Sequence, residues 1–245
     1  MYPRVKFRIS ARKDIASFGS FVGQADFDNG RSLRWAILRW HPLLRQAIKN
    51  GKIVDRIFAE KYVKDIYRKN RGIASKNMER YERDWRKKEG IFFEMTDDIF
   101  HGCPWPPGKY IAYATIWGMF PRFLDDKTFQ VPMEYRNKKY IPVTIAHEML
   151  HFMFYAYVEK NYPRYRDPEH NFFLWHISEI FNILVINSPA WLDVFREKNM
   201  LYPEHRKIVA ELRKKYQEPS SLDADSLIRD IHPLVKKMMQ EKKPI

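Results

Sequence analysis

The spacing of apolar residues in the first third of the chain predicts one strand followed by helices. Residues 4–10 alternate between apolar and basic side chains, which is typical of a half-buried strand. Segment 31–49 reads as a helix that Pro42 should kink or split, because proline lacks the amide that continues the helical ladder. In segment 53–67, apolar residues recur every three or four positions, which predicts an amphipathic helix. The N-terminal region is therefore expected to be mostly helical.

The middle of the chain carries the pattern of a small sheet. A short apolar run at 91–95 and a β-branched and aromatic run at 110–118 each predict a strand. Segment 128–136 alternates between apolar and polar residues around Pro132. Because proline cannot donate to a strand ladder, we expect this third segment to lie at the edge of the sheet.

The most apolar stretch of the chain follows the predicted sheet, at residues 141–157. Apolar residues occur on every side of a helix built from it, so this helix should be buried in the middle of a domain. A second helix is expected from Asp167 to about Asn187, because Asp-Pro-Glu is a typical helix start. Further helices are expected at 191–199, at 202–216 and from Ser221 onward.

Together these elements predict the α+β class, with a small mixed sheet, a central helix and mostly helical terminal parts. We expect a strand and helices in 1–90, a core of sheet and central helix in 91–190 and a helical region in 191–245. No clear linker separates these regions, so they are expected to form one continuous domain.

His147, Glu148 and His151 form an H-E-x-x-H motif within the central helix. Residues four apart lie one turn above each other, so both imidazoles can reach one ion. Glu148 is rotated by about 100° from His147 and can contact a water on that ion. Two nitrogen ligands, an open coordination position and a carboxylate that takes a proton are the parts of a zinc hydrolase. The alternatives are a core helix with hydrogen-bonded histidines and a membrane span, which the polar midpoint argues against.

The next predicted helix offers three candidates for a third metal ligand: His170, His176 and Glu179. A carboxylate in the middle of an apolar stripe requires a metal ion or a buried cation. His170 lies about 180° from Glu179, so the two cannot easily share one ion. Glu179 is therefore the favoured ligand, and His170 and His176 stay open as alternatives. At about 100° per residue, the apolar residues within roughly 40° of Glu179 are Phe172, Trp175, Ile183 and Ile186.

A mixed sheet, an edge strand and an H-E-x-x-H helix resemble the zincin metallopeptidases. The resemblance covers roughly residues 90–190, and its one specific motif is five residues long. It implies a Zn²⁺ cofactor, a peptide or protein substrate held along 128–135, and peptide-bond hydrolysis with Glu148 as general base and acid. It also implies a downstream Tyr or His that stabilises the oxyanion; Tyr202 and His205 are candidates, although a packing role is favoured for both.

Two branches of the zincins remain as interpretations. A glutamate ligand from a downstream helix, here Glu179, is similar to the third ligand of the gluzincins. A histidine ligand, here His170, is similar to the third ligand of the SprT-like zincins. Phe154 and Tyr157 stand where metzincins require glycine and histidine, which excludes that branch.

The charge of the chain favours a second, different hypothesis. A net charge of +14 over 245 residues predicts attraction to polyanions, and segment 68–88 combines many cations with Tyr81 and Trp85. The alternative function is binding of nucleic acid or nucleoprotein with a structural or vestigial metal, or a protease recruited to nucleic acid. Acidic residues interrupt the basic segment, so a solvated helix with aromatic anchors is the favoured interpretation.

Cysteine usage and the N-terminus bear on the compartment. Cys103 is the single cysteine, so an intrachain disulfide is excluded and a buried or inert thiol is expected. The first residues carry no apolar stretch typical of a signal peptide. We therefore expect an intracellular, cytoplasmic protein without a membrane span.

Overall fold

A computed structural model of the chain describes residues 2–23, 33–50, 52–165, 172–216 and 222–241. The chain divides into two compact units, each built from segments distant in sequence. The first unit, called here the metal-site unit, comprises Met1–Pro3, Asp84–Gly108 and Lys139–Ile245. The second, the sheet unit, comprises Arg4–Arg83 and Lys109–Lys138. These segments do not coincide with the consecutive regions 1–90, 91–190 and 191–245 expected from the sequence.

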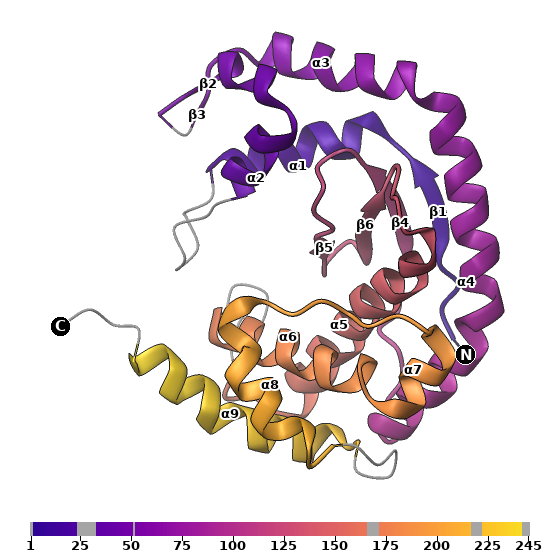
Figure 1. Cartoon of the computed structure of the whole chain (residues 1–245), viewed down its shortest axis with the longest axis vertical. Helices are drawn as coiled ribbons and strands as arrows, with labels where there is room; N and C mark the ends of the chain where they lie inside the picture. Colours follow the sequence, from indigo (N-terminus) through magenta and orange to yellow (C-terminus); the bar gives the residue numbers. More distant parts are fainter. Residues whose placement is uncertain (1, 24–32, 51, 166–171, 217–221, 242–245) are drawn as a thin grey trace. The chain divides into compact units, whose positions relative to one another are not determined.

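The sheet unit contains a four-stranded mixed sheet (Figure 1). Its strands are β1 (Lys6–Ile9), β4 (Ile111–Thr115), β6 (Thr128–Pro132) and β5 (Arg122–Phe123), in that spatial order. β4 pairs in parallel with β1 and β6, and β5 pairs with β6 antiparallel. A separate antiparallel pair joins β2 (Ile48–Lys49) to β3 (Lys52–Ile53). The α+β class with a small mixed sheet is therefore confirmed.

The prediction that segment 128–136 lies at the sheet edge is wrong. β6 pairs along its length with β4, and Thr128 and Phe129 also pair with β5. Pro132 is tolerated in this interior strand because it lies beyond the short β5, where no ladder partner requires its missing amide.

The prediction of a strand at 91–95 is also wrong, because this segment belongs to α4 (Arg71–Ile99). A five-residue apolar run does not distinguish a strand from a buried helix. The seven-residue spacing of Trp85, Phe92 and Ile99 indicates a helix, because seven residues correspond to about two helical turns. All three side chains are buried, and the rings of Trp85 and Phe92 lie 5.1 Å apart.

The remaining helices of the sheet unit follow the predicted pattern. α2 (Leu33–Trp40) ends before Pro42, which begins the 3₁₀ helix η1 (Pro42–Ala47), so the predicted split is confirmed. α3 (Arg56–Lys69) is the predicted amphipathic helix, and Asp55 caps it by accepting a bond from the Phe58 amide. The helix α1 (Ala11–Gly23) precedes them.

Asp14 of α1 joins the helices of the sheet unit to its strands. Its carboxylate accepts hydrogen bonds from the Tyr67 hydroxyl at 2.8 Å, the Ile116 amide at 2.9 Å and the Gln130 side-chain amide at 2.6 Å. The side chain is completely buried. Burial raises the pKa of Asp14 to about 6, although these hydrogen bonds act in the opposite direction.

We expect Asp14→Asn to change the pH dependence of stability. The folded pKa of about 6 exceeds the unfolded value, so protonated Asp14 stabilises the fold below about pH 4 and this contribution is lost as pH rises through 6. The asparagine does not titrate, and Gln130 can turn its amide to accept from it. The difference in unfolding free energy between variant and parent should therefore shift in favour of the variant by about 2 kcal/mol between pH 4 and 7.5. Urea denaturation across this range measures it; a pH-independent difference would contradict the argument.

The metal-site unit is a helical assembly around α6 (Phe172–Ile186), which packs against α5, α7, α8 and α9 (Figure 1). Its other helices are α5 (Ile141–Asn161), α7 (Pro189–Phe195), α8 (Arg206–Arg213), α9 (Ala224–Glu241) and the 3₁₀ helix η3 (Pro203–His205). The unit also includes α4 from Asp84 onward and η2 (Lys138–Tyr140) from Lys139 onward.

The predicted helices of this unit are present, with some changes in their ends. α5 is confirmed as a helix that is buried on nearly every side. α6 ends at Ile186, as expected, and its predicted start at Asp167 lies outside the described residues. α7 ends earlier than predicted because Arg196 adopts a left-handed conformation, with φ of 63°. None of the described helices has the length and apolar character needed to cross a membrane.

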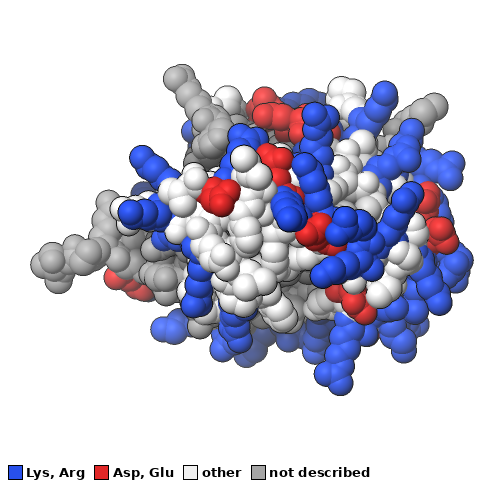
Figure 2. Space-filling view, turned by 90° about the horizontal axis from the view of Figure 1, so that it is seen from above, with Lys and Arg blue, Asp and Glu red and all other residues white. Residues whose placement is uncertain are grey.

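The basic segment 68–88 mostly lies in α4, and its aromatic rings face the core. Tyr81 is 1% exposed and Trp85 is 0% exposed, so neither ring is available to stack on a base. Acidic neighbours bind part of the positive charge, as Glu89 does with Arg86 at 2.5 Å. Lys and Arg side chains also spread over the face seen in Figure 2, with Asp and Glu among them. These observations favour a solvated surface.

Candidate metal centre

The two histidines of the motif meet on one face of α5, which begins after Tyr140 with Pro142 in its first turn. The Nε2 atoms of His147 and His151 are 3.0 Å apart. The His151 side chain is fully buried, and that of His147 is 13% exposed. The one-turn spacing therefore brings both imidazoles to a common point, as predicted.

Glu179 reaches the same point from α6. Its Oε2 atom lies 3.2 Å from the His147 Nε2 atom, and its Oε1 atom lies 3.3 Å from the His151 Nε2 atom. These three residues form a group that could hold a metal ion, with candidate ligand atoms within 4.8 Å of one another. All three belong to the metal-site unit.

The spacing of these atoms fits a four-coordinate zinc ion. Ligand atoms about 2.0–2.2 Å from a tetrahedral Zn²⁺ are separated from one another by about 3.3 Å. The two Nε2 atoms are 3.0 Å apart, His147 Nε2 lies 3.2 Å from Glu179 Oε2, and His151 Nε2 lies 3.3 Å from Glu179 Oε1. Two imidazole nitrogens and one carboxylate oxygen are also a ligand set that zinc uses in catalytic sites, with a fourth position left open.

The charge of Glu179 is favourable for ligation. Complete burial by itself would raise the pKa of its carboxyl group. The positive form of His151 and hydrogen bonds from both histidines outweigh burial, so the pKa of Glu179 lies well below its ordinary value. The carboxylate is thus ionised, which is the form that binds a cation.

Polar residues outside the three ligands fix the orientation of His147. The side-chain amide of Asn199 lies 2.5 Å from the His147 Nδ1 atom. The Tyr140 hydroxyl is 2.9 Å from the Asn199 Oδ1 atom, and the Met200 amide donates to that hydroxyl at 3.1 Å. On the helix side, the Asn182 side-chain amide donates to the His147 carbonyl at 3.0 Å. Such outer partners hold metal-binding imidazoles in one orientation.

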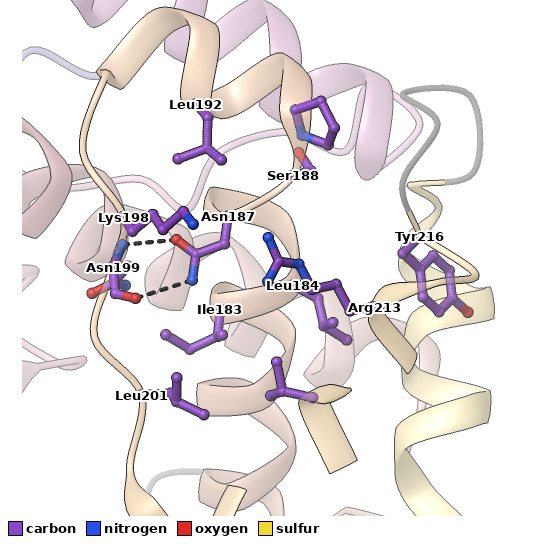
Figure 3. A pocket seen from close by; sticks show the side chains of 12 residues that line it. Ile183, Leu184, Asn187, Ser188, Leu192, Lys198, Asn199, Leu201, Arg213 and Tyr216 are labelled. Atoms are coloured by element: carbon purple, nitrogen blue, oxygen red, sulfur yellow. Dashed lines mark hydrogen bonds between the residues drawn. The ribbon is translucent and has the colours of Figure 1, made fainter. Parts of the chain in front are cut away.

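The backbone of Asn199 is itself held to the end of α6. The Asn199 amide donates to the Asn187 Oδ1 atom at 2.7 Å, and the Asn187 side-chain amide donates to the Asn199 carbonyl at 3.0 Å (Figure 3). This pair of bonds is called here the Asn187–Asn199 clamp. Because α6 also carries Glu179, the clamp ties the residue that orients His147 to the helix that supplies the third candidate ligand.

Binding through Nε2 requires the proton of neutral His147 to be on Nδ1, where it needs an acceptor. The oxygen and nitrogen of an asparagine amide occupy equivalent places, so the Asn199 amide can be turned to present its oxygen to Nδ1. Its nitrogen would then donate to the Tyr140 hydroxyl. The site therefore contains an acceptor suited to the ligating tautomer.

We expect Asn199→Ala to weaken zinc binding by about 10–100-fold, the usual cost of losing an outer partner of a metal-binding histidine. Asn199→Asp should keep most of the affinity, because a carboxylate also accepts from Nδ1. Competition with a chromophoric chelator measures both. Asn161→Ala is the matched control, since the one bond that the Asn161 side chain makes within the described part of the chain is to the Tyr157 carbonyl of its own helix. Equal zinc affinity of the parent and Asn199→Ala would contradict the role of Asn199 in orienting His147.

The other sequence candidates do not join this group. His170 lies outside the described residues. The His176 Nδ1 atom bonds to the His205 Nε2 atom at 2.7 Å. Both rings are buried, and neither belongs to the group of His147, His151 and Glu179. Tyr202 packs its ring near those of Trp175 and His205. Cys103 is a half-buried free thiol in the loop after α4.

Glu148 is 6% exposed and lies beside the histidine face of α5. The H-E-x-x-H motif predicts a role for Glu148, whereas no motif predicts one for Tyr140 or Asn199. Tyr140 directly precedes the motif helix, which is a weak signal. Asn199 is 52 residues from His147 and belongs to no motif, so only the fold reveals it.

Comparison of the chain with protein-family models, with curated proteins and with solved structures gave no match.

Proposed function

We propose that this protein is a zinc-dependent hydrolase that cleaves peptide bonds. The observation that carries the proposal is the largely buried group of His147, His151 and Glu179. Its two Nε2 atoms are 3.0 Å apart, and each lies 3.2–3.3 Å from one oxygen of the Glu179 carboxylate, close to the ligand separations of a tetrahedral zinc site. Burying three ionisable side chains together is costly unless they pair or bind an ion. No other group of this kind is found among the described residues.

In this proposal each residue has a separate role. His147, His151 and Glu179 would hold Zn²⁺, which polarises a carbonyl group and lowers the pKa of a coordinated water. Glu148 accepts a proton from the attacking water and donates it to the leaving amine. Asn199 and Tyr140 keep the His147 ring in the orientation that leaves its Nε2 atom available.

A peptide bond is proposed as the target because the H-E-x-x-H segment resembles that of the zincin metallopeptidases. A substrate strand along 128–135 is no longer part of the proposal, since β6 is paired on both sides at its start. The alternative of nucleic-acid binding retains only the net charge in its favour, because Tyr81 and Trp85 are buried.

Metal analysis and a cleavage assay test the proposal together. Purified protein should contain about one zinc per chain, and it should produce new termini in a mixture of unfolded proteins, detected by mass spectrometry. A chelator should abolish the cleavage, and added zinc should restore it. Protein that binds no zinc under these conditions would refute the proposal.

A further inference from the structure

A pocket of about 290 Å³ lies next to the Asn187–Asn199 clamp (Figure 3). It is formed by the end of α6, by α7, by residues 198–201 and by α8. Its walls are mainly aliphatic: Ile183, Leu184, Leu192, Leu201 and Val209. No local sequence pattern predicts this pocket, because its walls come from four separate segments.

Two cations, Lys198 and Arg213, also line the pocket. Both side chains are exposed, and neither forms an ion pair with another described residue. In Figure 3 their charged ends turn toward the side of the pocket where Asn187 lies. An aliphatic hollow beside two unneutralised cations is complementary to a molecule that carries an apolar body and an anionic head.

The volume limits the size of that molecule. A space of 290 Å³ corresponds to about ten water volumes in the liquid, and therefore to about ten non-hydrogen atoms. We propose that this pocket binds a small amphipathic anion, with a carboxylate or phosphate-ester head at Lys198 and Arg213 and an apolar body against the aliphatic walls. Apolar burial would supply the affinity, and the cations would select the anion.

The inference goes beyond the proposed hydrolase and does not depend on it, because the pocket contains none of the candidate metal ligands. The two sites nevertheless share Asn199, whose side chain contacts His147 while the residue also lines the pocket. A bound anion would thus lie against the residue that orients a metal ligand.

Isothermal titration of the full chain tests the proposal, with octanoate, octyl phosphate and octanol as probes. Octanoate and octyl phosphate have the required body and charge, and octanol has the body alone. We expect at least one anion to bind at least about tenfold more tightly than octanol, the factor typical of a charge-assisted hydrogen bond. The tighter of the two anions identifies the head group.

Variants separate the pocket from general electrostatics. Lys198→Gln with Arg213→Gln should reduce anion binding to the level of octanol. Arg206→Gln with Lys207→Gln is the matched control, because it removes two exposed charges of α8 that do not line the pocket. Val209→Phe should fill the pocket and weaken all three probes.

Three results would overturn the proposal: no binding of either anion at millimolar concentration, equal binding of octanol, or an equal loss in the control double variant. The titration repeated with Glu179→Gln should give unchanged anion binding. That result would show that anion binding in the pocket does not depend on the candidate metal site.

Discussion

Replacing Glu179 by glutamine is expected to abolish stable zinc binding at the candidate centre. Glutamine has almost the same shape but no negative charge, so the ion would keep two neutral imidazoles and lose its only anionic ligand among the three. Losing an outer partner costs about 10–100-fold in affinity, and losing a direct ligand should cost more. The parent protein should melt at a higher temperature when zinc is added, because a ligand that binds only the folded state stabilises it. The variant should show no such increase.

The measurement is zinc content by metal analysis, together with thermal unfolding with and without zinc. Glu159→Gln is the matched control, because it removes a carboxylate that is exposed near the end of α5. Circular dichroism checks that Glu179→Gln is folded. Unchanged zinc content in the folded variant would contradict the assignment, and loss of zinc in His170→Ala would then transfer the role of third ligand to His170.

Replacing Glu148 by glutamine is expected to leave zinc bound and to reduce cleavage by about 10²–10⁴-fold, the usual contribution of general acid–base catalysis. Glutamine fills the same buried space but cannot accept a proton from water. Glu148 is not one of the three grouped donors, so zinc content should stay at the parent level. The pair of variants therefore separates ligation from proton transfer.

The same cleavage assay and metal analysis apply to Glu148→Gln. Glu148→Asp is the informative companion, because it retains a carboxylate at shorter reach and should recover part of the activity. Equal cleavage by Glu148→Gln and the parent would remove Glu148 from the mechanism. Loss of zinc in Glu148→Gln would instead indicate a direct role in ligation.

Local sequence patterns were sufficient to predict features that depend on a single helix. The burial of α5 and the apolar surroundings of Glu179 follow from the distribution of apolar residues around each helix, and the split at Pro42 follows from the amide that proline lacks. The same reasoning failed at 91–95, where an apolar run was too short to reveal its period. It failed again at Pro132, since the length of β5 is fixed by another part of the chain.

The sequence by itself determined that His147 and His151 share a face, because a spacing of four residues fixes their positions on any helix. It also singled out Glu179 as a carboxylate that needs a partner. Only the tertiary structure decided that Glu179 lies within 3.3 Å of both rings and that Asn199 contacts His147 from 52 residues away. Packing between helices sets those distances, and no local pattern encodes which side chains of two separate segments meet.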